Sequence, residues 1–133
     1  MKATIYFSEI NQLLSRKGIK ATLSSGYETN SFRVQYTFRI LLFIKKDVSA
    51  TIRLKSYSDT VINLGFSLYG LGSLENKAKK VIRNKLPGFI TMVKDNELKV
   101  DIGNIKALKK AGIQVRLNNI EINDLGLIIN SKI

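Results

Sequence analysis

The feature that most constrains this chain is the segment from position 32 to position 44, in which every second residue is apolar. One face of this segment carries seven apolar or aromatic side chains: Phe32, Val34, Tyr36, Phe38, Ile40, Leu42 and Ile44. The intervening residues are polar as far as Arg39, after which Leu41 and Phe43 make both faces apolar. Alternation with a period of two predicts a β-strand with one buried face. A strand of this length is longer than usual, so we expect strong curvature or a bulge.

Two further alternating segments follow and predict an antiparallel meander. Lys45-Lys46-Asp47 and Ser58-Asp59 are expected to form the turns between the strands. Gly65 within the last strand indicates a bend or a close approach of another group to the backbone. The predicted inner faces of these two strands are Val48, Ala50, Ile52 and Leu54, and then Ile62, Leu64, Phe66 and Leu68.

An amphipathic helix is predicted over 73–86, with Ser73 as its N-cap. Leu74, Ala78, Val81, Ile82 and Leu86 recur at helical spacing and form its apolar stripe. Pro87-Gly88 stops or kinks the helix, with 89–93 as a possible helical continuation. A short strand and a helix ending at Gly18 precede the meander, and short strands and a short helix follow it. The predicted fold is α+β, a single domain over 1–133: a long curved antiparallel meander wrapped around one amphipathic helix, with short peripheral helices.

The composition argues against most catalytic machinery. The chain has no cysteine and no histidine, which excludes thiol nucleophiles, imidazole bases, disulfides and His- or Cys-ligated metals. The ten acidic residues are scattered, with Asp95/Glu97 and Glu121/Asp124 as the nearest clusters, and the phosphate-binding motifs of nucleotide enzymes are missing. We therefore expect a binding protein rather than an enzyme, with no cofactor and no metal.

The net charge of +12 favours anionic partners. Four bases of the predicted helix are candidates for contact with an anionic surface: Lys77, Lys79, Lys80 and Arg83. The alternative interpretation is that they form only the solvated face of an amphipathic helix. Nucleic acid also remains open as a partner, although few aromatic residues are expected on the surface to stack with bases.

The large apolar face of the meander suggests a groove closed by the helix. An alkyl chain would lie between sheet and helix in such a groove. The other possibility is that the same side chains simply fill their own core. The candidate groove residues are Phe38, Ile40, Leu42, Ile52, Leu54, Leu64, Phe66, Leu68, Val81, Ile82 and Phe89.

Three segments resemble the tubular lipid-binding (TULIP) superfamily in its short, single-module bacterial form. IYFSEINQLL at 5–14 is similar to an opening helix with an acidic residue, Ile, Asn and a later Leu. The meander at 32–69 followed by helix 73–86 resembles the order of elements in the module, and GIQVRLNNIEIND at 112–124 resembles its terminal strand. The resemblance implies a curved sheet wrapped around a helix, and a groove that holds lipid acyl chains.

These observations predict a non-enzymatic lipid or hydrophobic-ligand binder, with affinity for anionic lipid as a further expectation. The alternatives are a basic nucleic-acid-binding protein and a protein-interaction subunit with a self-filled core. No apolar run approaches the roughly 20 residues of a membrane-spanning helix, so the sequence as it stands predicts a cytoplasmic protein. Removal of a leader from a longer chain would instead make it secreted or membrane-associated. The sequence does not specify the oligomeric state.

Overall fold

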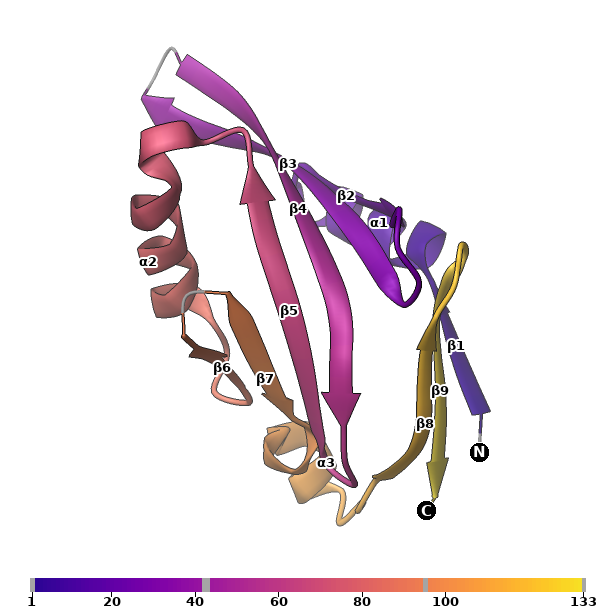
Figure 1. Ribbon diagram of the computed structural model, residues 1–133. Helices are drawn as coiled ribbons and strands as arrows, with labels where there is room; N and C mark the ends of the chain where they lie inside the picture. Colours follow the sequence, from indigo (N-terminus) through magenta and orange to yellow (C-terminus); the bar gives the residue numbers. More distant parts are fainter. Residues whose placement is uncertain (1, 42–43, 95, 133) are drawn as a thin grey trace.

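The alternating segments form the centre of an antiparallel sheet in the computed structural model, which describes residues 2–41, 44–94 and 96–132 (Figure 1). Within these residues the strands are β1 (Lys2–Tyr6), β2 (Ala21–Ser25), β3 (Ser31–Leu41), β4 (Ile44–Tyr57), β5 (Val61–Tyr69), β6 (Ile90–Val93), β7 (Glu97–Asp101), β8 (Arg116–Ile122) and β9 (Gly126–Lys132). The helices are α1 (Phe7–Arg16), α2 (Glu75–Lys85) and α3 (Lys106–Lys110), with single 3-10 turns at Gly72–Leu74 and Ile102–Asn104. The predicted α+β class and the long meander are confirmed.

The larger sheet has six strands in the order β2-β3-β4-β5-β7-β6, with β3, β4 and β5 as the meander. The expected irregularities are present as register shifts between Arg39 and Leu41 and between Leu54 and Ser56. Gly65 lies opposite Arg53, and the stem of Lys55 crosses it so closely that a Cβ at this position would lie 3.0 Å from the Lys55 side chain. Gly65 therefore marks a close approach, as the sequence indicated.

The predicted turn at Lys45-Lys46-Asp47 is wrong. These residues belong to β4, because the β3–β4 ladder continues until Leu41 pairs with Ile44. Three charged residues in a row suggested a turn, but each additional ladder pair satisfies backbone hydrogen-bonding groups. Asp47 also gains a partner, since the Thr37 hydroxyl donates a hydrogen bond to its Oδ1 at 3.0 Å.

Two predictions around the main helix are also corrected. Ser73 makes no capping hydrogen bond, because α2 begins one 3-10 turn later at Glu75. Residues 90–93 do not continue the helix but form β6, in which Ile90 pairs with Val100. Leu86, which precedes Pro87, has an extended backbone with ψ of 139°. Proline disfavours helical geometry in the residue before it, so the helix ends there and the chain is free to pair with β7.

One face of the six-stranded sheet is apolar, and both long helices lie on it. The pairing aligns Phe32 of β3, Ile52 of β4 and Phe66 of β5 on this face. Phe7 of α1 packs on Phe32, with ring centroids 5.8 Å apart, and the Nζ atom of Lys79 in α2 lies 5.9 Å from the Phe66 ring centroid. Because Phe32 and Phe66 share a face, α1 and α2 cover the same side of the sheet.

The smaller sheet has the order β1-β9-β8 and lies beyond β4, on the other side of the β4–β5 hairpin from α2 in Figure 1. A register shift between Leu117 and Asn119 changes the alternation of β8, so that Leu117, Ile120 and Ile122 are all buried. Asn30 links the two sheets: its carbonyl accepts from the Leu54 amide, and its side-chain Oδ1 accepts from the Ile122 amide at 3.0 Å.

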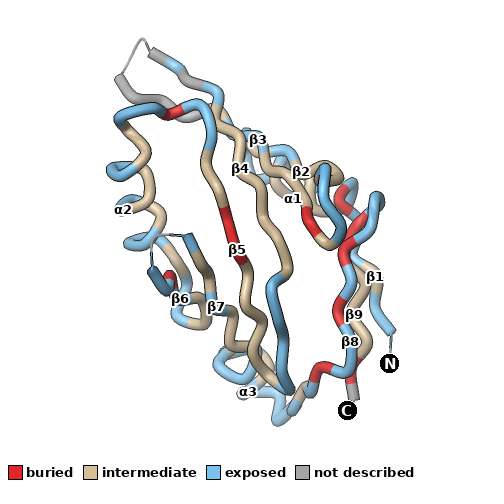
Figure 2. Tube along the Cα trace, in the orientation of Figure 1, coloured by how far each residue is buried: buried red, intermediate tan, exposed pale blue. Residues whose placement is uncertain are grey.

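The buried apolar residues of the described chain are spread over several elements. Figure 2 shows buried segments on β5 and β8, and others in β6 and in the turn after β5. The sequence places Phe66, Ile52, Leu64, Val81 and Ile82 in the core; Phe66 is buried, Ile52, Leu64 and Ile82 are half-buried, and Val81 is 39% exposed. The buried apolar residues among those described are Phe7, Phe66, Leu71, Met92, Leu117, Ile120 and Ile122.

Candidate apolar ligand pocket

An apolar pocket of about 280 Å³ lies between α2 and three strands of the meander: the middle of β3, the first part of β4 and the last part of β5. The sheet supplies Tyr36, Val48 and Leu68, whose positions in the ladder put them on the apolar face. Leu71, which is only 4% exposed, contributes from the turn after β5. The helix and the residue after it supply the rest of the lining: Ala78, Val81, Ile82, Lys85 and Leu86.

The helical side of this pocket follows from helix geometry. Residues 78, 81, 82 and 85 are spaced i, i+3, i+4 and i+7, so they lie on one face of α2. Seven of the nine described lining residues are purely apolar, Tyr36 presents a ring and a hydroxyl, and Lys85 has the one charge in this set. Such a lining favours a ligand with an apolar body.

The predicted groove residues divide into three groups. Leu68, Val81 and Ile82 line the pocket. The others lie elsewhere: Phe66 is buried beneath Lys79, and Ile52, Leu54, Leu64 and Phe89 are half-buried outside the pocket lining. Leu42 is not among the residues that the structure describes. Phe38 and Ile40 belong to β3, but their side chains are not among those described. The pocket is therefore at the α2 end of the meander rather than along its whole length.

Several lining residues are not among the predicted groove residues, although most of them carry a signal in the sequence. Tyr36 and Val48 belong to the predicted inner alternation, and Ala78 and Leu86 belong to the predicted helical stripe. Lys85 follows Val81 by four residues, so helical spacing alone puts it on the same face. Leu71 had no such signal, because its position depends on how the Gly70–Gly72 turn folds back towards the helix.

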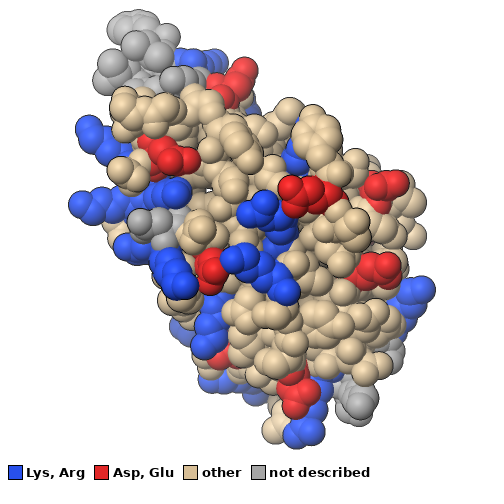
Figure 3. Space-filling model, in the orientation of Figure 1, with Lys and Arg blue, Asp and Glu red and all other residues tan. Residues whose placement is uncertain are grey.

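The predicted anionic contact surface maps to α2 with one departure. Lys77, Lys80 and Arg83 are exposed, and basic side chains gather along the edge of the molecule formed by α2 in Figure 3. Lys79 is half-buried instead, because its ammonium group lies over the Phe66 ring. Lys77 and Lys80 thus lie on the exposed face of α2, and Lys79 connects the helix to the sheet.

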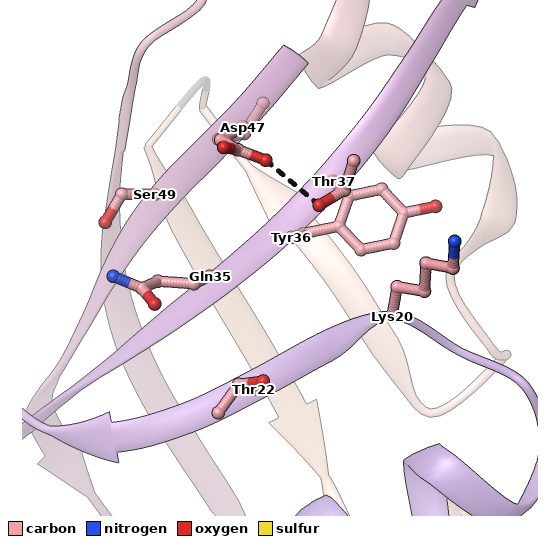
Figure 4. A pocket seen from close by; sticks show the side chains of 8 residues that line it. Lys20, Thr22, Gln35, Tyr36, Thr37, Asp47 and Ser49 are labelled. Carbon is pink, nitrogen blue, oxygen red and sulfur yellow. Dashed lines mark hydrogen bonds between the residues drawn. The ribbon is translucent and has the colours of Figure 1, made fainter. Parts of the chain in front are cut away.

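A second hollow of about 420 Å³ has a different chemistry (Figure 4). It is lined mainly by polar side chains of β2, β3 and β4, among them Thr22, Gln35, Thr37, Asp47 and Ser49. Thr37 and Asp47 are hydrogen-bonded to each other, and the figure shows the other polar side chains spread around the hollow. No set of converging titratable groups, which acid–base catalysis requires, is present in this lining.

The acidic residues of the described chain stay apart. No three acidic side chains within 2–41, 44–94 and 96–132 gather in a way that would hold a metal ion. Glu97 pairs with Lys55, and Glu121 and Asp124 are exposed. None of the helices described is long and apolar enough to cross a membrane.

Comparison with known proteins gives no match, whether to a protein-family model, to a curated protein or to a solved structure.

Proposed function

We propose that this protein binds a lipid or another hydrophobic ligand without chemical conversion, holding an alkyl chain between its sheet and α2. The observation that carries the proposal is the pocket of about 280 Å³ with seven purely apolar residues among its nine described lining residues. Small-molecule sites are typically concave and mostly apolar, with volumes of about 300–1,000 Å³. The pocket volume of about 280 Å³ lies just below this range and favours a single chain.

The exposure of the lining supports a binding site over a self-filled core. Val81 is 39% exposed, and Leu68 and Ile82 are only half-buried, although all three point into the interface between helix and sheet. Covering these side chains with a ligand would remove apolar surface from water, which contributes about 0.8 kcal/mol for each buried methylene group. The sequence resemblance to the TULIP superfamily leads to the same expectation.

The test is calorimetric titration with fatty acids of eight to eighteen carbons. We expect the affinity to rise about fourfold for each added methylene and to level off once the pocket is full. Val81→Trp should abolish this rise by filling the pocket. The matched control is Asn84→Trp, because Asn84 is an exposed α2 residue outside the pocket lining.

Two results would contradict the proposal. One is an affinity that does not depend on chain length, and the other is wild-type affinity in a folded Val81→Trp variant. Either result would favour the protein-interaction subunit or, given the net charge of +12, a nucleic-acid-binding protein. Nucleic-acid binding would then be checked through the salt dependence of its affinity, measured with a single strand and with a duplex.

A further inference from the structure

One of the described residues that line the pocket is basic, and this residue indicates the polar end of the ligand. Lys85 is the only charged residue among the nine described residues that line the pocket, and no acidic residue is among them. It is exposed and lies in the last turn of α2. A lysine in this position lays its apolar stem along the pocket while its ammonium group stays in water.

We infer that the ligand is a single-chain fatty acid whose carboxylate pairs with Lys85. This inference rests on the proposed function and specifies its ligand class. An apolar lining next to one positive charge complements an alkyl chain that ends in one negative charge. A single lysine neutralises the one negative charge of a carboxylate, whereas a phosphate group, with a charge of about −1.5 to −2, would leave excess negative charge beside an apolar lining. The small volume of the pocket argues against a second chain.

The role assigned to Lys85 differs from that of the other bases on α2. Lys77 and Lys80 are exposed but do not line the pocket, so they attract every anion through the general field of the protein. Among the described lining residues, Lys85 alone is placed to distinguish one headgroup from another on a chain that already lies in the pocket. A comparison of headgroups on the same chain therefore isolates its contribution.

The experiment compares dodecanoate with dodecanol, which share a chain and differ in charge. The wild type should bind dodecanoate about two- to fivefold more tightly, the size expected of a favourable exposed ion pair. This preference should weaken as the salt concentration rises. Lys85→Met should bind both ligands equally, whereas Lys80→Met, which removes the same charge from the same helix, should keep the preference. Lys85→Glu should prefer dodecylamine over dodecanol.

The contrary outcomes separate the role of Lys85, the choice of headgroup and the proposed function from one another. A preference that survives in Lys85→Met, or that disappears equally in Lys80→Met, overturns the role of Lys85. Tighter binding of dodecyl phosphate than of dodecanoate overturns the choice of headgroup. Equal binding of dodecanoate and dodecanol by the wild type overturns the headgroup inference and leaves the proposed function standing. Binding of neither ligand by the folded wild type overturns both.

Discussion

The side-chain amide of Asn11 makes two hydrogen bonds with the backbone of Leu23. Its Nδ2 donates to the Leu23 carbonyl at 2.9 Å, and its Oδ1 accepts from the Leu23 amide at 2.7 Å. Leu23 belongs to β2, which is an edge strand of the larger sheet and would otherwise leave these groups unpaired. Asn11 therefore connects α1 to the sheet edge, which is a physical role for the asparagine of the 5–14 segment.

Replacement of Asn11 by Asp should destabilise the protein. The carboxylate keeps the acceptor for the Leu23 amide but loses the donor, and it places a negative charge beside the Leu23 carbonyl. A loss of about 1–3 kcal/mol is expected in the free energy of unfolding, measured with urea. The control is Gln12→Glu, which makes the same charge change at an exposed position of the same helix. Equal losses in the two variants would contradict the role given to Asn11.

Phe66 should be the most costly residue of the meander to truncate. It is 5% exposed and carries the Lys79 ammonium group over its ring. Phe66→Ala should cost about 3–5 kcal/mol of unfolding free energy, and Lys79→Met about 0.5–1 kcal/mol. Tyr69→Ala is the control, because Tyr69 lies on the same strand and is 56% exposed. A cost below about 1 kcal/mol for Phe66→Ala would show that the ring is not part of the core.

The ion pair between Lys55 and Glu97 predicts a pH dependence of stability. Lys55 Nζ donates to Glu97 Oε1 at 2.7 Å, and this hydrogen bond and the lysine charge lower the pKa of Glu97, with a smaller contribution from Lys94. The folded-state pKa thus lies below the unfolded value of about 4.3. The contribution to stability is complete above the unfolded value and is lost as the pH falls through the folded one.

The measurement is the melting temperature of wild type and Glu97→Gln between pH 7 and pH 2.5. The difference between the two proteins should be largest near neutral pH and should shrink below about pH 4.3. Lys55→Met should return the Glu97 pKa towards its ordinary value in an NMR titration. A stability difference that does not change with pH would contradict the assignment.

The sequence was sufficient to predict which residues lie on the apolar face of the meander, but not where the strands and helices begin and end. Alternation from Phe32 onward identified the apolar face, because each strand keeps its period between register shifts. The β3–β4 turn was misplaced, because the ladder continues through residues whose charge suggested a loop. Residues 90–93 form a strand by pairing with β7 in a short hairpin, and an apolar run this short does not by itself distinguish a strand from a helix.

The position of the pocket was also only partly predictable. Helical spacing identified Val81 and Ile82 as facing the sheet, and alternation identified Leu68 as facing the helix. Neither pattern predicts where along the sheet a pocket remains between the sheet and α2. That depends on Phe66 and Lys79, which occupy the contact between β5 and α2, and on Leu71, which folds back from the turn. Lys79 was expected on the outer face, because a charged side chain normally avoids burial unless a partner such as the Phe66 ring is present.

If the basic face of α2 contacts anionic membranes, reversing Lys77 and Lys80 to Glu should weaken vesicle binding. Each basic residue near such a surface is worth about 1 kcal/mol, so the double variant should lose at least about thirtyfold in affinity for vesicles containing phosphatidylserine. Lys79 is left unchanged, because its ammonium group lies over Phe66 and its loss would disturb packing.

The matched control is the double variant Lys109→Glu, Lys110→Glu on α3, which makes the same change in net charge at exposed positions. Co-sedimentation with vesicles measures both variants. Equal losses of vesicle affinity in the two double variants would show that only the overall charge of +12 attracts the membrane. Unchanged vesicle binding by a folded Lys77→Glu, Lys80→Glu variant would exclude this face of α2 as the contact.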